Sequence, residues 1–129
     1  MTPPPTIALL IDSDVLIDYL RDKPEAVAFI DGLTNPLFLS TINVAELYAG
    51  VRDGAERTKL ERFILAFTVL PIDQTIAVTG GLLRRDYGKT HGTGLADALI
   101  AATVQRHNIR LVSLNGKHFP MIPDLIIPY

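Results

Sequence analysis

A run of five apolar residues, Ile7 to Ile11, leads directly into Asp12 near the start of the chain. A short, wholly apolar run predicts a strand that is buried on both faces of a parallel sheet. Other short apolar runs predict further strands, at 37–40, 68–72, 109–114 and 125–127. The run at 68–72 contains Pro71, which cannot donate to a strand ladder, so we expect this strand at an edge of the sheet.

Helices are predicted between these strands, because apolar residues recur there at helical spacing. They cover 14–20, 24–33, 41–51, 55–67, 74–87 and 95–105. We expect Ser13 or Asp14 to cap the first helix and Asp73 to cap the fifth. The glycine-rich segment 88–94 should be a mobile loop. Alternating strands and helices predict one α/β domain over 1–129, a three-layer α/β/α sandwich around a short, mainly parallel sheet.

The composition narrows the possible functions. The chain has 129 residues and no cysteine, which excludes disulfides and thiolate metal ligands. Its net charge is −2 and its pI is about 5.8, so a nucleic acid would have to be bound through local positive charge or metal ions. Residues 1–5 form a proline-rich arm without the features of a signal peptide, and no apolar run reaches the roughly 20 residues that cross a membrane. We therefore expect a cytoplasmic protein.

Three carboxylates stand where a purely structural chain would place apolar residues. Asp12 ends the first strand, while Glu46 and Asp97 lie in otherwise apolar helical segments. Neither helical acid has a lysine or arginine three or four residues away, the spacing that allows pairing within a helix. A buried, unpaired carboxylate costs several kcal/mol, and a hard divalent cation removes that cost. The acids therefore predict a metal site, provided that the fold brings them together.

Each acid also has a simpler interpretation. Asp12 can be a helix N-cap, Asp97 can favour a helix dipole near the start of its helix, and Glu46 can face solvent. Such roles are each plausible for a single residue. All three together are a weaker explanation if the side chains converge, and the sequence alone does not show whether they do.

The whole chain resembles PIN-domain proteins of the VapC type, which are toxins of bacterial toxin–antitoxin pairs. Four stretches in order support the resemblance: 10–17, 40–50, 95–103 and 111–119. It implies a parallel sheet flanked by helices and an acidic pocket for Mg²⁺ or Mn²⁺ that cleaves RNA. It assigns the metal roles to Asp12, Glu46 and Asp97. Many relatives have a fourth acid in the last stretch, where Asn115 is the nearest catalytic candidate here, and Asp14 could supply the missing charge.

The resemblance also implies partners. These are an RNA substrate, a VapB-like antitoxin whose tail blocks the acidic groove, and a second copy of the chain in a homodimer. Basic residues near the glycine-rich segment could contact RNA phosphates or could simply form a solvated charged face: Arg84, Arg85, Lys89, His91 and Lys117.

Two other functions fit parts of the sequence. Asp12-Ser-Asp14 after an apolar strand is also similar to phosphatases of the haloacid-dehalogenase type, in which the first aspartate is the nucleophile. We find no adjacent acidic pair downstream, which those enzymes require. A non-catalytic α/β interaction module is the other alternative, and Asn115 in place of an acid favours it.

Overall fold

The structure, a computed structural model, describes residues 4–129 and contains a four-stranded parallel sheet. The strands are β1 (Leu9–Ile11), β2 (Leu37–Ser40), β3 (Thr68–Leu70) and β4 (Arg110–Val112), in the order β3-β2-β1-β4. As predicted, β3 lies at an edge. The segment predicted as a last strand pairs only through a single bridge between Ile126 and Val112.

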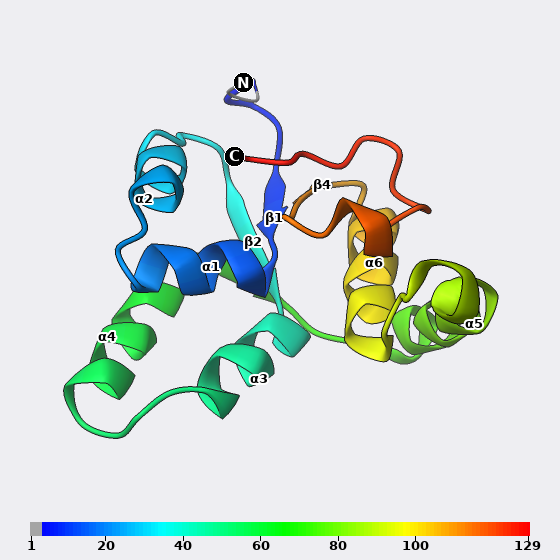
Figure 1. The fold of residues 1–129 in the computed structure, drawn as a ribbon, viewed down its shortest axis with the longest axis horizontal. Helices are drawn as coiled ribbons and strands as arrows, with labels where there is room; N and C mark the ends of the chain where they lie inside the picture. The colour runs from blue at the N-terminus through cyan, green and yellow to red at the C-terminus, as the bar shows by residue number, and fades with distance from the viewer. Residues whose placement is uncertain (1–3) are drawn as a thin grey trace.

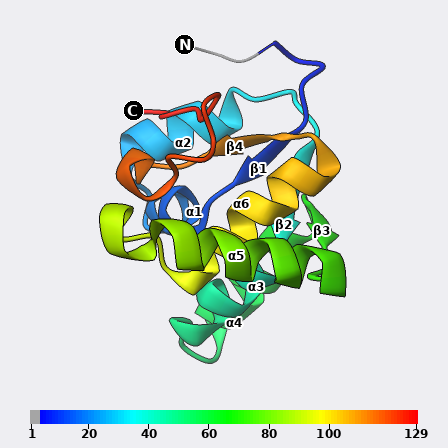
Figure 2. The same cartoon turned by 90° about the vertical axis from the view of Figure 1, so that its right-hand side faces the viewer.

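Helices cover both faces of the sheet (Figure 1). They are α1 (Ser13–Leu20), α2 (Pro24–Asp31), α3 (Thr41–Ala49), α4 (Ala55–Ile64), α5 (Gln74–His91) and α6 (Leu95–His107), with a short 3₁₀ helix, η1 (Gly116–His118). Figure 2 shows α5 crossing the outer side of α6. The α/β/α architecture predicted from the sequence is confirmed.

The central strand explains the layering, because its successive side chains point to opposite faces. Leu9 and Ile11 pack into a core with residues of α1, α2, α3 and α4. Leu10 packs on the other face with Ile100 of α6 and with Phe119. All three β1 residues are fully buried, so the backbone that leads into Asp12 is fixed from both sides.

Two local predictions were wrong. The segment 88–94 is not a loop throughout, because α5 continues to His91 and ends at Gly92, whose φ of +67° favours glycine. The N-cap of α1 is Asp12, as the simpler interpretation of that acid predicted, and not Ser13 or Asp14, which were expected to cap the helix. In the proline-rich arm, residues 1–3 lie outside the described residues, and Pro4 accepts a hydrogen bond from the Ile7 N–H that closes a turn.

Among residues 4–129, no helix is both long and apolar enough to cross a membrane.

Candidate active site: an acidic cluster at the carboxyl end of the sheet

Asp12 lies at the carboxyl end of β1, where the strand passes into α1. Its Oδ1 accepts a hydrogen bond from the Ser13 N–H at 2.8 Å, and its Oδ2 accepts one from the Ser113 hydroxyl at 2.8 Å. Only 5% of the residue is exposed. Within the described part of the chain, serine donors hold this carboxylate and no cationic side chain pairs with it. Asp12 is therefore a buried acid without a counter-charge from the protein.

Burial is the main reason that the pKa of Asp12 is raised from 3.8 to about 7, and the charges of Asp14 and Glu46 raise it further. The hydrogen bonds from Ser113 and Ser13 act in the opposite direction, because they favour the ionised form. Burial also raises the pKa of Asp14. A divalent cation at this position would stabilise the ionised forms that the protein alone disfavours.

Asp14 and Asp12 share a donor. The Ser113 hydroxyl lies 3.3 Å from Oδ2 of Asp14, and the same oxygen accepts the Leu114 N–H at 3.1 Å. Ser113 is fully buried directly after β4, so it joins the ends of two adjacent strands to both acids. Sequence reasoning missed this serine. The available signal was a hydroxyl residue that follows an apolar strand, as Ser40 also does at β2.

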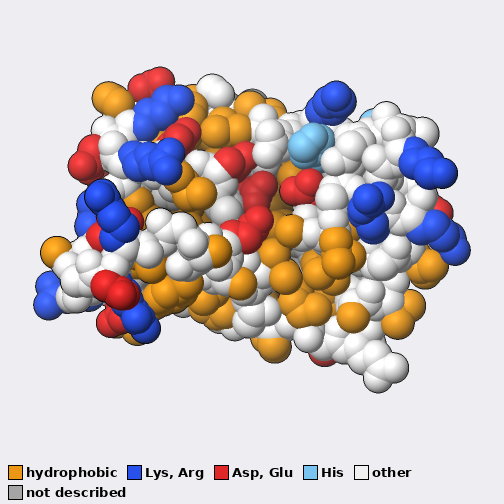
Figure 3. Space-filling model, turned by 60° about the horizontal axis from the view of Figure 1, so that its bottom comes forward, with side chains coloured by type: hydrophobic (Ala, Val, Ile, Leu, Met, Phe, Trp, Pro, Cys, Tyr) orange, Lys and Arg blue, Asp and Glu red, His pale blue; other side chains and the backbone are white. Residues whose placement is uncertain are grey.

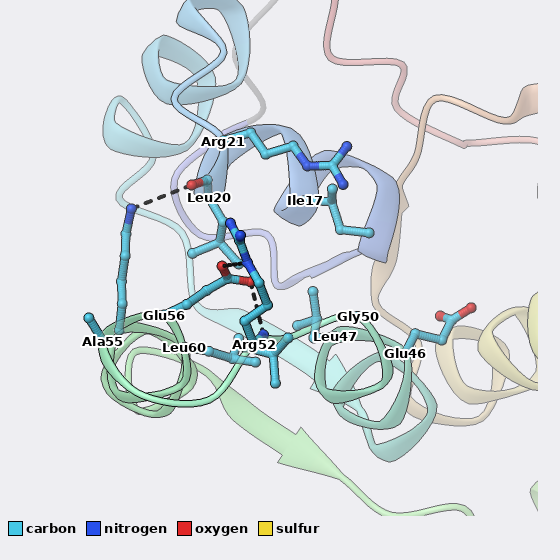
Figure 4. A pocket seen from close by; sticks show the side chains of 12 residues that line it. Ile17, Leu20, Arg21, Glu46, Leu47, Gly50, Arg52, Ala55, Glu56 and Leu60 are labelled. Atoms are coloured by element: carbon cyan, nitrogen blue, oxygen red, sulfur yellow. Dashed lines mark hydrogen bonds and ion pairs between the residues drawn. The ribbon is translucent and has the colours of Figure 1, made fainter.

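Glu46 reaches the same place from α3. Its Oε1 accepts a hydrogen bond from the Ser13 hydroxyl at 2.8 Å, and Asn43 donates to that hydroxyl oxygen at 3.0 Å. The Glu46 side chain is exposed, as the solvent-facing interpretation predicted, because Asn43 and Leu47 occupy the buried face of α3. In Figure 4 it extends away from the other labelled side chains, on the side of α6. Glu46 is therefore exposed to solvent and at the same time hydrogen-bonded to Ser13.

Asp97 lies in the first turn of α6. Its Oδ2 accepts the Gly94 N–H at 3.2 Å and lies 3.3 Å from Nδ1 of His118 on η1. The helix dipole favours a negative charge at this position, as expected for a single acid there. The contact of His118 with Asp97 was not predicted. His118 is 21 residues away and follows no periodic pattern, so the sequence offered no signal for the contact.

Acidic side chains gather in one patch at the centre of the face shown in Figure 3, with a histidine beside them. Ser13 and Ser113 connect Asp12, Asp14 and Glu46 by hydrogen bonds, whereas among residues 4–129 the Asp97 carboxylate makes polar contacts only with Gly94 and His118. We call these four acids the acidic cluster. Within residues 4–129, no three His, Asp or Glu side chains lie close enough together to form a ready-made metal cage. The donor set still fits a hard divalent cation, because it consists of carboxylate oxygens and includes a buried acid without a counter-charge.

The remaining candidates lie on α5, on η1 and directly before η1. Asn115 is exposed before η1, and its side chain makes no cap hydrogen bond. Four of the basic candidates lie in the second half of α5 and the fifth lies on η1: Arg84, Arg85, Lys89, His91 and Lys117. Arg85 pairs with Asp86 at 2.9 Å, so its charge is partly neutralised.

A pocket of about 560 Å³ opens beside Glu46, between α1, α3 and α4 (Figure 4). Its apolar side chains include Ile17, Leu47 and Leu60, while Arg21 and Lys59 contribute positive charge. The pocket therefore combines an apolar lining with cationic groups next to the acidic cluster.

Comparison with known proteins places this geometry in context. A family model described as PIN domain matches residues 9–125. The chain is 40% identical over 127 residues to Ribonuclease VapC10 of Mycobacterium tuberculosis, covering 94% of this chain and 92% of that protein.

Solved structures resemble the fold, among them the following two. A toxin–antitoxin complex from Klebsiella pneumoniae matches with a TM-score of 0.81 and 28% identity, over 94% of this chain and 98% of that chain. FitAcB from Neisseria gonorrhoeae matches with a TM-score of 0.73 and 30% identity, over 93% and 97% respectively.

Proposed function

The chain belongs to the PIN-domain family, among relatives of the VapC ribonucleases, and on this premise we propose that it is a metal-dependent endoribonuclease acting as the toxin of a toxin–antitoxin pair. The observation that supports this most is Asp12, a buried acid without a protein counter-charge, tied through Ser13 to the exposed Glu46. The family match favours this function over the phosphatase and the interaction module.

Asp12, Glu46 and Asp97 would hold Mg²⁺ or Mn²⁺, with Asp14 or Asn115 as an additional oxygen donor. When bound, the cation supplies Lewis-acid chemistry, in which it activates water and offsets negative charge that develops on the phosphate. Ser113 and Ser13 orient Asp12 and Glu46 through the hydrogen bonds described above. Ser113 lies at the end of a strand and Ser13 on a helix, so both donors are rigidly placed. The carboxylates that they hold therefore need little reorganisation when substrate binds.

RNA would approach along the face in Figure 3, where basic side chains lie at both sides of the acidic patch. We propose that the basic residues of α5 and η1 contact phosphates and position the strand without reading its sequence. Lys89 and Lys117 are exposed and therefore suited to this role. Replacing both with alanine should raise KM for RNA more than it lowers kcat.

An antitoxin would bind at the acidic cluster and in the pocket beside it. The structural neighbour from Klebsiella pneumoniae is a toxin–antitoxin complex. We propose that an apolar segment of the antitoxin enters the pocket beside Glu46 and that a cationic side chain of that segment reaches the acidic cluster.

We also propose a homodimer. Val78 and Leu82 are exposed one turn apart on α5, and Leu95 is exposed at the start of α6. Sedimentation of the purified chain should give twice the monomer mass of 14.1 kDa. A single species of monomer mass at micromolar concentration would contradict it.

The test of the nuclease is the Asp97→Asn variant, assayed on labelled RNA in Mg²⁺ or Mn²⁺. Because Asp97 is half-buried at the start of α6, the variant should fold normally. It should lose cleavage, because the amide removes the charge of a proposed metal ligand. Asp124→Asn is the matched control, since Asp124 is an exposed aspartate that pairs with Arg110 outside the acidic cluster. Full activity of Asp97→Asn in excess metal would contradict the proposed function.

A further inference from the structure

A histidine that has no assigned role contacts one of the proposed metal ligands. Nδ1 of His118 lies 3.3 Å from Oδ2 of Asp97, and the two side chains are 35% and 23% exposed. The contact connects η1, which follows β4, to the first turn of α6. It therefore connects two segments that meet only in the folded chain.

His118 is itself held in place from several directions. The Thr93 hydroxyl donates to the His118 carbonyl oxygen at 2.8 Å, and the His118 N–H donates to the Asn115 carbonyl at 2.9 Å. The next residue, Phe119, is 1% exposed and packs in the core with Leu10 and Ile100. The backbone that carries the imidazole is thus anchored to the core.

The contacts of Asp97 are one-sided. Both of the polar contacts recorded for this carboxylate among residues 4–129 involve Oδ2, one with the Gly94 N–H and one with His118. Oδ1 is left available to a cation. Contacts to one oxygen favour one orientation of a carboxylate, and outer partners of metal ligands commonly act in this manner.

We propose that His118 is a positioning residue, which holds Asp97 through Oδ2 so that Oδ1 is directed at the metal. The inference rests on the proposed function, because it requires Asp97 to be a ligand. His118 need not touch RNA or the reacting phosphate. The proposal requires the imidazole to carry a proton on Nδ1, which faces Oδ2 at 3.3 Å, and its role is to reduce the rotational freedom of the carboxylate before the cation binds.

The experiment measures the affinity of the full chain for Mn²⁺ alone, by calorimetry and by loss of the free-ion EPR signal, without RNA. His118→Ala should weaken Mn²⁺ binding about 10- to 100-fold, the usual cost of losing an outer partner of a ligand. His118→Asn should stay within about threefold of the native chain, since its amide nitrogen can occupy the position of Nδ1 and donate to Oδ2. His107→Ala, at the exposed end of α6, is the matched control and should bind Mn²⁺ normally.

The outcomes separate the two proposals. If Asp97→Asn binds Mn²⁺ as well as the native chain, the proposed metal site fails and the positioning role fails with it. If Asp97→Asn loses binding while His118→Ala keeps it, only the positioning role is overturned. Equal losses in His118→Ala and His118→Asn would also overturn it, because they would mean that the imidazole itself is a ligand. Thermal unfolding in EDTA shows whether each variant is folded, and His118→Asn provides the test even if His118→Ala is not.

Discussion

Asp12 and Asp97 belong to the same acidic cluster, yet the protein holds their carboxylates in different ways. On the strand side, Asp12 and Asp14 share the buried Ser113, and backbone N–H groups donate to both acids. On the helix side, Asp97 accepts one backbone N–H and lies against the partly exposed His118. The strand side is a buried network, and the helix side is a looser contact between two chain segments.

The two carboxylates also differ in the free energy that their ionisation costs the folded protein. Asp12 is buried, so its ionisation works against folding unless a cation compensates. Asp97 is half-buried at the positive end of a helix, so its charge costs the fold little. We infer that the buried charge of Asp12 lowers the stability of the fold. The charge of Asp97 costs little, and this side chain mainly needs to be held in the right orientation.

The largest expected effect is the loss of RNA cleavage in Asp12→Asn. The amide has nearly the same shape but carries no charge, so we expect a loss greater than the roughly 10- to 100-fold that outer partners of a ligand cost. In EDTA at pH 8 the same variant should be more stable than the native chain, because it no longer buries a charge. Asp97→Asn should also lose cleavage, but its stability should change by less than about 1 kcal/mol. Equal changes in stability for the two variants would remove the distinction between the two sides.

The next effect is a dependence of stability on pH. The pKa of Asp12 is raised from 3.8 to about 7 in the folded protein, so between these values the folded state holds a proton that the unfolded chain has lost. The resulting stabilisation is complete below pH 3.8 and is lost as the pH rises through 7. At about 1.4 kcal/mol per pH unit the loss is at most ~4 kcal/mol.

Chemical unfolding in EDTA from pH 4 to pH 8 measures this effect as the difference between the native chain and Asp12→Asn. The free energy of unfolding of the native chain should fall relative to that of the variant across this range. Asp97→Asn serves as the comparison and should follow the native curve. Parallel curves for the native chain and Asp12→Asn would show that ionisation of Asp12 does not destabilise the folded protein.

Removal of the shared donor on the strand side should have a smaller effect. Ser113→Ala leaves Oδ2 of Asp12 buried without its hydroxyl donor, which should cost about 1–3 kcal/mol. The loss should be greater at pH 8 than at pH 5, because the Ser113 hydrogen bond lowers the pKa of Asp12. Ser40→Ala is the matched control. Ser40 is equally buried at the end of β2 and caps α3, so its loss should cost about 1 kcal/mol at either pH.

The strand side could be predicted from the sequence, and its physical basis is local. Five apolar residues followed by an acid specify a buried strand that ends at Asp12, and the structure has that arrangement. The four strands and six helices of the sandwich likewise follow from apolar periodicity. Ser113 was missed because a single serine after a strand is common, and only the pairing of β1 with β4 brings it to Asp12.

The helix side depends on contacts that no local pattern shows. The 88–94 segment looked like a loop because of its glycines, yet the Arg84 guanidinium lies over Gly88, where a side chain would otherwise be, and α5 continues. Gly80 similarly lets α5 approach Leu99 of α6 closely. The close packing of α5 against α6 outweighs the low helix propensity of glycine, and the helix continues to His91.

The smallest effect concerns the support of His118. Thr93 is 1% exposed, and its hydroxyl donates to the His118 carbonyl at 2.8 Å. Thr93→Val keeps the shape and removes this donor, so it should cost about 1 kcal/mol and weaken Mn²⁺ binding by less than His118→Ala does. Thr103→Val is a closely matched control, because Thr103 is also buried and its hydroxyl donates to the Leu99 carbonyl at 2.7 Å within α6. The two variants should lose similar stability, but only Thr93→Val should lose affinity for Mn²⁺, since only Thr93 supports the segment that holds Asp97. If both lost affinity equally, general loosening of the fold would explain the effect, and the helix side would not need a specific orienting contact.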